Sequence, residues 1–232
     1  SLFIQVPRDE FDKKVKDIYL RAAKEIGDVP VQVANDGDVT ALAGAMSLEE
    51  NRILGIAMGT SEAVGYVDAA GNITGWLNEL AFAPVDLQDD AMVDEWSGDR
   101  GCGVKYFSQD SVIKLAPRAG IALDESLSPA EKLKVVQAEM DKGNEHAKDI
   151  YHSIGVYLGH TLAYYAAYYD IGHVLLLGRV MSGEGGDIII AEASRVLKDE
   201  YPDAAGMELH LPDEKIRRVG QSVAAASLPE IL

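Results

Sequence analysis

The sequence predicts an α/β fold in which a mixed sheet is flanked by helices. Residues 53–58 and 173–177 form largely apolar runs, which are typical of strands covered on both faces. A glycine-containing turn follows each run, and the second turn leads into an amphipathic helical stretch. Strands in succession, followed by alternating helices and strands, indicate a sheet with an antiparallel part and a parallel part.

Before the first of these strands, the chain predicts a helix, a short strand and a second helix. Residues 11–26 place apolar side chains on one helical face and lysines and aspartates opposite them, and Gly27 with Pro30 ends the stretch. Residues 31–34 are predicted to form the strand. The alanine-rich residues 37–46 are predicted to form the second helix.

Residues 53–77 predict a meander of three antiparallel strands. Turn signals at residues 59–61 and 68–72 divide this segment into three apolar stretches. An acidic, irregular segment is expected at residues 78–96, and Ser128 to Glu131 form a capping box that starts a helix. The strands of the meander are expected at 53–58, 63–67 and 73–77, the later helices at 106–115, 133–140, 144–169, 187–200 and 214–228, and the later strands at 173–177 and 207–211.

This order of elements resembles the ribonuclease-H-like unit of the superfamily that contains actin, the heat-shock ATPases and many sugar kinases. Members of that superfamily carry two such units, with a nucleotide in the cleft between them. The resemblance implies that residues 1–47 are the end of a preceding N-terminal unit and that residues 48–232 form a ribonuclease-H-like domain. It implies a fold, and a fold alone does not specify an activity.

Charge and cysteine content narrow the classes of function. The formal net charge of -17 argues against binding of nucleic acid or anionic membrane surfaces, which favour basic patches. The single cysteine, Cys102, excludes an intrachain disulfide, so a reducing cytoplasm is the expected compartment. No apolar run is long enough to span a membrane, and the start has no signal peptide.

Asp36 is the first candidate catalytic residue, because it lies where a predicted strand ends and a helix begins. A carboxylate at that point can accept the proton of a substrate hydroxyl that attacks a phosphoryl group. The alternative is that Asp36 caps the helix, since aspartate and asparagine are preferred at that position. Asp38 is expected only to strengthen the favourable charge at the helix start.

Two turns are candidates for nucleotide binding. Gly59-Thr60-Ser61 offers small residues, backbone N–H groups and hydroxyls that are able to surround an anion, although an ordinary hairpin turn has the same composition. The glycine-rich residues 178–186 join a buried strand to a helix, where a nucleotide base or ribose is able to lie against the backbone. A flexible connection is the alternative for this second turn.

A metal site is not predicted. Glu95, Ser97, Cys102 and the five histidines do not form a ligand set, because a structural zinc site needs four soft ligands at close spacing. The histidines on predicted helices, at positions 146, 152 and 160, are interpreted as surface or core residues.

Taken together, these motifs resemble the ROK family of bacterial sugar kinases and repressors over essentially the whole chain. Residues 31–43 are similar to the family's connecting motif, and this similarity implies that Asp36 is the catalytic base and that Asn35 contacts substrate. Gly59-Thr60 matches the second phosphate motif, and residues 175–186 are similar to the adenosine motif. By this resemblance, ATP with Mg²⁺ is the cofactor, and the nucleotide-binding residues are Gly59, Thr60, Gly178, Ser182 and Gly183.

Departures from the family concern the sugar and zinc sites. Asn78-Glu79-Leu80-Ala81-Phe82 aligns with the family's Gly-Glu-x-Gly-His, so Glu79 keeps the sugar contact whereas Phe82 replaces a histidine. A second sugar-binding glutamate falls on Val104. Two zinc cysteines fall on Glu95 and Ser97, so no structural zinc is expected. The family's glycine-rich first phosphate loop is missing, which implies that the chain is the C-terminal portion of a ROK protein and is inactive alone.

Two classes of function follow from the resemblance. The first is an ATP-dependent kinase that phosphorylates a sugar or related polyol, and Asp36, Gly59 and Thr60 favour it. The second is a non-catalytic sugar sensor of the repressor branch, which the changes at Phe82 and Val104 favour. The expected partners are a small-molecule sugar, ATP and a second copy of the chain in a homodimer.

Overall fold

The computed structural model describes residues 5–27, 29–74, 76–213 and 219–228. These residues belong to two compact units, one made of Ser1–Ala34 with Ala225–Leu232 and the other of Asn35–Ala224. The division falls ahead of Asn35, whereas the sequence predicts a boundary between residues 47 and 48, and the predicted boundary remains a proposal.

The described part of the first unit contains a helix that is interrupted near its middle. A short α1 (Arg8–Glu10) continues into a π-helical turn at Phe11–Val15, and α2 follows at Ile18–Ile26. Asp17 lies between them with φ 57°, in the left-handed region that aspartate tolerates better than most residues. The prediction of one continuous helix over residues 11–26 is therefore wrong. The predicted strand at residues 31–34 is also absent, and these residues have an irregular backbone.

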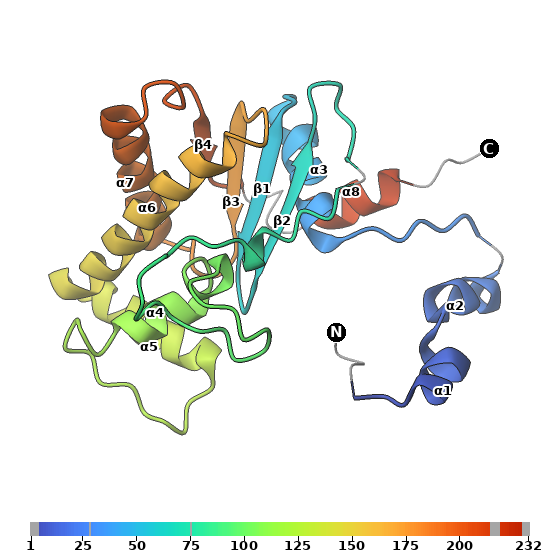
Figure 1. The fold of residues 1–232 in the computed structure, drawn as a ribbon, viewed down its shortest axis with the longest axis horizontal. Coiled ribbons are helices and arrows are strands. Elements are labelled where there is room, and N and C mark those ends of the chain that lie inside the picture. The colour runs from blue at the N-terminus through green and yellow to red at the C-terminus, as the bar shows by residue number, and fades with distance from the viewer. Residues whose placement is uncertain (1–4, 28, 75, 214–218, 229–232) are drawn as a thin grey trace. The chain divides into compact units, whose positions relative to one another are not determined.

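The second unit is built on a sheet of four strands in the order β2-β1-β3-β4 (Figure 1). β1 (Ile53–Met58) pairs antiparallel with β2 (Glu62–Val67) and parallel with β3 (His173–Leu177), which pairs parallel with β4 (Glu208–His210). The predicted mixed sheet is confirmed. The third meander strand, at residues 73–77, is not; its described residues contribute an isolated bridge between Val67 and Ile73.

Helices cover both faces of this sheet, with α3 (Asp36–Leu48) on one side and α6 (Glu145–Tyr165) on the other (Figure 1). The backbone of α3 touches the strands directly, because a Cβ atom at Gly55 would lie 2.7 Å from the Ala41 nitrogen. α7 (Glu184–Glu200) packs along α6, and the main hydrophobic core lies between these helices and the sheet.

Two of the remaining helices, α4 (Gln109–Leu115) and α5 (Pro129–Asp141), also contribute buried side chains to this core. The capping box predicted at Ser128 is confirmed, since its hydroxyl accepts from the Glu131 N–H and the Glu131 carboxylate accepts from the Ser128 N–H. Residues 214–218 of the predicted last helix lie outside the described residues. No described helix combines the length and apolar character that a membrane crossing requires. The other elements that follow α3 in the chain are the 3₁₀ turns Leu80–Phe82 and Gly103–Lys105 and the helices α4 (Gln109–Leu115), α5 (Pro129–Asp141) and α8 (Gln221–Ser227).

Candidate functional site

The start of α3 carries the candidate base. Asn35 is the N-cap, and its side-chain oxygen accepts from the Gly37 N–H over 2.8 Å. Asp36 is the first helical residue, is exposed, and also accepts from the Gly37 N–H, over 3.0 Å. The capping role that competes with catalysis at Asp36 is therefore filled by Asn35. This use of the Asn35 oxygen also limits what Asn35 is able to offer a substrate.

Asp38 has a larger structural role than the sequence indicates. Its carboxylate accepts from the Asn78 amide over 3.0 Å, and a backbone N–H bond comes from Tyr66. Burial raises the pKa of Asp38, the two hydrogen bonds lower it, and the nearby charge of Asp36 raises it again, so that the net shift is upward. No spacing rule links residues 38 and 78, and the sequence therefore gave no signal for this bond.

Glu79 follows Asn78 directly and is exposed. It precedes the 3₁₀ turn Leu80–Phe82, whose last residue donates its N–H to the Glu79 carbonyl over 3.1 Å. Asn78 itself is 6% exposed and has a left-handed backbone with φ 51°. The bond from Asn78 to Asp38 thus brings the loop that carries Glu79 to the helix that carries Asp36.

The predicted phosphate turn joins β1 to β2. The Gly59 N–H donates to the Ser61 carbonyl over 3.0 Å, so this N–H is used within the turn and is not free as the sequence analysis expects. The Gly59 carbonyl accepts from the Gln109 N–H at the start of α4 over 2.9 Å. Thr60 and Ser61 are exposed at the tip, and the Ser61 hydroxyl donates to the Glu62 carbonyl over 3.5 Å.

The glycine-rich loop contacts this turn through the end of β1. The Val180 N–H donates to the Met58 carbonyl over 3.2 Å. Gly178 has φ 108°, and a Cβ atom there would lie 2.2 Å from the Met58 carbonyl oxygen. The structure therefore places Gly178 against Met58, the last residue of β1, directly before Gly59. Two motifs separated by more than a hundred residues meet at the carboxyl ends of neighbouring parallel strands, where α/β sheets commonly bind ligands.

A cavity of about 350 Å³ adjoins the glycine-rich loop and has the size of a small-molecule site. Gly178, Arg179 and Ser182 line one wall, and Ala43 of α3 and Gln221 of α8 line others. The Gln221 side chain donates to the Thr40 hydroxyl over 2.6 Å, and that hydroxyl donates to the Asp36 carbonyl over 2.9 Å. Two hydrogen bonds thus connect Gln221, in the wall of the cavity, to the backbone of Asp36, the candidate base.

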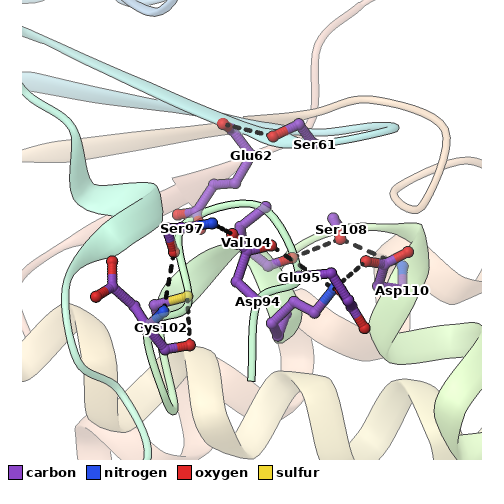
Figure 2. Close-up of polar contacts among 11 residues, drawn as sticks. Ser61, Glu62, Asp94, Glu95, Ser97, Cys102, Val104, Ser108 and Asp110 are labelled. Atoms are coloured by element: carbon purple, nitrogen blue, oxygen red, sulfur yellow. Dashed lines mark hydrogen bonds and ion pairs between the residues drawn. The ribbon is translucent and has the colours of Figure 1, made fainter. Parts of the chain in front are cut away.

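The segment that aligns with the family's zinc ligands forms contacts of a different kind. The Lys105 ammonium lies 2.5 Å from the Glu95 carboxylate and 2.8 Å from that of Asp110. Burial of Lys105 disfavours its charge, but these hydrogen bonds outweigh burial and raise its pKa. Figure 2 shows Ser97 and Cys102 close to one another in this segment. The Ser97 hydroxyl accepts from the Asp99 N–H over 3.1 Å, and Cys102 is 1% exposed. Glu95 therefore forms an ion pair, and Ser97 a hydrogen bond, with other residues of the chain.

Apolar side chains occupy the positions aligned with the sugar-binding histidine and glutamate. Val104 is buried with Ala81 and Cys102, and Phe82 packs against this small cluster. The ring of Phe82 lies 5.6 Å from that of Trp96, measured between centroids. None of these side chains is able to accept a hydrogen bond from a sugar hydroxyl through a carboxylate or imidazole. Of the three positions that the resemblance assigns to sugar contacts in this part of the chain, Glu79 is the one with a polar side chain.

Glu62 is a buried acid that the sequence analysis did not single out. It is 5% exposed, and neither carboxylate oxygen has a hydrogen-bond partner among the described residues. Figure 2 shows its side chain pointing from the hairpin toward the loop that carries Val104. Burial raises the pKa of Glu62 from 4.5 to about 8.

Comparison with known proteins finds the same fold in solved structures of the ROK family. A ROK glucokinase from Streptomyces griseus, in complex with glucose and AMPPNP, superposes with a TM-score of 0.71 at 16% identity. A ROK hexokinase from Thermus thermophilus gives 0.69 at 19% identity, and a ROK transcriptional regulator homologous to the E. coli MLC protein gives 0.69 at 20%. No family model and no curated protein matches the sequence.

These structures cover most of this chain, but the chain covers less of them. The two kinases and the regulator cover 90%, 90% and 88% of this chain, which spans 71%, 68% and 53% of theirs. At these identities the likeness shows the fold, and it confirms the predicted ribonuclease-H-like architecture.

Proposed function

We propose that this chain is the C-terminal portion of a ROK-type kinase that transfers a phosphoryl group from ATP to a hydroxyl of a sugar or related polyol. The observation that carries the proposal is the arrangement at the start of α3. Asn35 caps the helix, and among the described residues the exposed carboxylate of Asp36 accepts one hydrogen bond, from the Gly37 N–H. The hydrogen bond between Asn78 and Asp38 holds the loop that carries Glu79 beside this helix.

In this proposal each motif has one task. Asp36 accepts the proton of the substrate hydroxyl as that hydroxyl attacks the terminal phosphorus of ATP. Glu79 accepts hydrogen bonds from other hydroxyls of the sugar. The Gly59 turn, with Thr60, binds phosphate oxygens, and the cavity beside Gly178, Ser182 and Gly183 receives the adenosine. Mg²⁺ carried on the nucleotide neutralises phosphate charge.

The test is steady-state kinetics of the Asp36→Asn variant of the parent protein, as its gene encodes it, over a panel of sugars. Asparagine keeps the shape of the side chain but is unable to accept the proton, so turnover should fall by roughly 10²–10⁴-fold. ATP affinity and melting temperature should stay unchanged, because Asn35 still caps the helix.

Asp141→Asn, at the exposed end of α5, is the matched control and should keep full activity. Wild-type turnover of Asp36→Asn on the best sugar would eliminate Asp36 as the base.

A second candidate is a non-catalytic sugar sensor, and the apolar cluster around Val104 and Phe82 favours it. Loss of two polar sugar contacts is compatible with a binding protein that performs no chemistry. Calorimetric titration of the parent protein with sugars, together with the absence of sugar-dependent ATP hydrolysis, would favour the sensor over the kinase.

A further inference from the structure

We infer that the start of β3 and the short edge strand β4 form a binding site for a divalent transition metal, with His173, Glu208 and His210 as the ligands. The sheet register explains why they meet. His173 pairs with Glu208, and Leu175 pairs with His210, on neighbouring parallel strands. Side chains two residues apart in a strand share one face, so all three side chains project from the same face of the sheet. The sequence analysis did not predict this set because 37 residues separate the two histidines.

The distances match those of a tetrahedral centre. The His173 Nδ1 and His210 Nε2 atoms are 3.2 Å apart. Two imidazole nitrogens about 2.0–2.1 Å from one tetrahedral metal ion lie roughly 3.3 Å from each other. The Glu208 Oε2 atom is 3.9 Å from each of these nitrogens, and the three donor atoms all lie within 4.8 Å of one another. A small rotation of the exposed Glu208 side chain would complete three ligands and leave a fourth position for water.

The surroundings of His173 offer a partner for the ring nitrogen that faces away from the proposed metal. On that side, the Glu50 Oε2 atom lies 3.8 Å from Nε2. A small side-chain rotation would bring this carboxylate within hydrogen-bond distance of Nε2, and such a bond would orient the ring with Nδ1 toward the metal, as second-sphere carboxylates do for metal-bound histidines.

The donor atoms determine which metal ions the site would bind, and its location determines what the bound metal would do. Two imidazoles with one carboxylate suit Zn²⁺, Ni²⁺ or Cu²⁺, whereas Mg²⁺ and Ca²⁺ take oxygen ligands. His173 begins β3 and Gly178 follows its other end, so the site lies on the order of 15 Å from the glycine-rich loop. The metal would therefore join the three-residue edge strand β4 to β3 and take no part in phosphoryl transfer.

The test uses protein stripped of metal with a chelator. Calorimetric titration with ZnCl₂ should show one equivalent bound, and Co²⁺ should give the visible absorption of a four-coordinate centre. His210→Ala should weaken zinc binding by on the order of 100-fold, and Glu50→Gln should weaken it by roughly 10-fold. Glu208→Gln should weaken zinc binding as well.

His160→Ala is the matched control, because Glu200 alone among the described residues places a carboxylate near His160, and this variant should bind zinc as the wild type does. Melting curves with and without zinc separate a metal site from a simple hydrogen-bonded pair. Zinc should raise the melting temperature of the wild type and of His160→Ala but not of His210→Ala. The inference fails if the wild type binds no zinc, or if His210→Ala and Glu208→Gln bind it as tightly as the wild type.

Discussion

The Asn78 amide donates to the Asp38 carboxylate over 3.0 Å, and the Asn78 oxygen accepts from the Tyr169 hydroxyl over 3.1 Å. Asn78 therefore joins three segments that are distant in sequence: the start of α3, the loop before Glu79 and the chain after α6. Because Asn78 is almost completely buried, both bonds lie away from water. A buried amide with both ends satisfied fixes the relative position of the segments that it joins.

Replacement of Asn78 by alanine should lower the free energy of unfolding by about 1–3 kcal/mol, because it leaves the partly buried Asp38 carboxylate without this donor. Urea denaturation measures the change. Tyr169→Phe is the matched control, since it removes only the bond to the Asn78 oxygen and should cost about 1 kcal/mol. A loss for Asn78→Ala no larger than that for Tyr169→Phe would show that the bond to Asp38 contributes nothing.

Gly178→Ala should destabilise the protein by roughly 2–4 kcal/mol, because its backbone is left-handed and the new methyl group would overlap the Met58 carbonyl. Gly183→Ala is the comparison. Gly183 also has a positive φ, of 67°, but a Cβ atom there meets no atom within 4 Å. Its cost should be that of strain alone, roughly 1–2 kcal/mol. Melting temperatures of the two variants rank the two effects. An equal loss of stability in both would mean that the backbone at Met58 shifts at no cost to accommodate the methyl group.

The pH dependence of stability should carry the signature of Glu62. Burial raises the pKa of Glu62 from 4.5 to about 8, so the folded chain binds a proton that the unfolded chain has released between those values. The free energy of unfolding should therefore fall as the pH rises from about 4.5 to about 8 and should become flat above. Glu62→Met, which has no ionisable group, should remove this part of the slope and be more stable at pH 8. Urea midpoints between pH 4 and pH 9 provide the measurement, and parallel curves for the two proteins would contradict the prediction.

Lys105→Met should destabilise the protein by roughly 1–3 kcal/mol, because Asp94 and Asp110 lose their cation. The value lies below that of a fully buried pair since Glu95, the third partner, is 76% exposed. Lys132→Met, which disrupts a pair with the fully exposed Glu125, should cost less than 1 kcal/mol. Chemical denaturation of both variants at low and high salt makes the comparison, and equal losses would show that Lys105 acts as an ordinary surface charge.

Much of the second unit was predictable, because its strands and helices follow strong local patterns. The apolar run of β1, the capping box at Ser128 and the glycine-rich loop after β3 each appear in the structure where the sequence predicts them. Two of the predictions that failed are strands, whose formation depends on pairing. Residues 31–34 and 73–77 have apolar residues suited to strands, but a strand forms only where a partner strand lies beside it.

The candidate site was predictable only where one stretch of sequence carries the whole motif. The contiguous Asn35-Asp36 pair and the Gly59-Thr60 turn belong to that class. The bond from Asn78 to Asp38, the buried Glu62 and the pairing of His173 with His210 depend on contacts between distant segments. Such contacts follow from the register of the sheet and the placement of α3, which local patterns do not encode.

The direct contact between α3 and the sheet also restricts how this unit is able to move. At Gly37 and Gly65 the helix and β2 meet backbone to backbone, and no layer of side chains separates them. Packed helices slide past one another by small adjustments of intervening side chains, and at this contact there are none to adjust. We therefore expect the start of α3 and β2 to move as one body, so that Asp36 and the Gly59 turn move together. The spacing between the proposed base and the proposed phosphate turn would then be set when the chain folds, before any ligand binds.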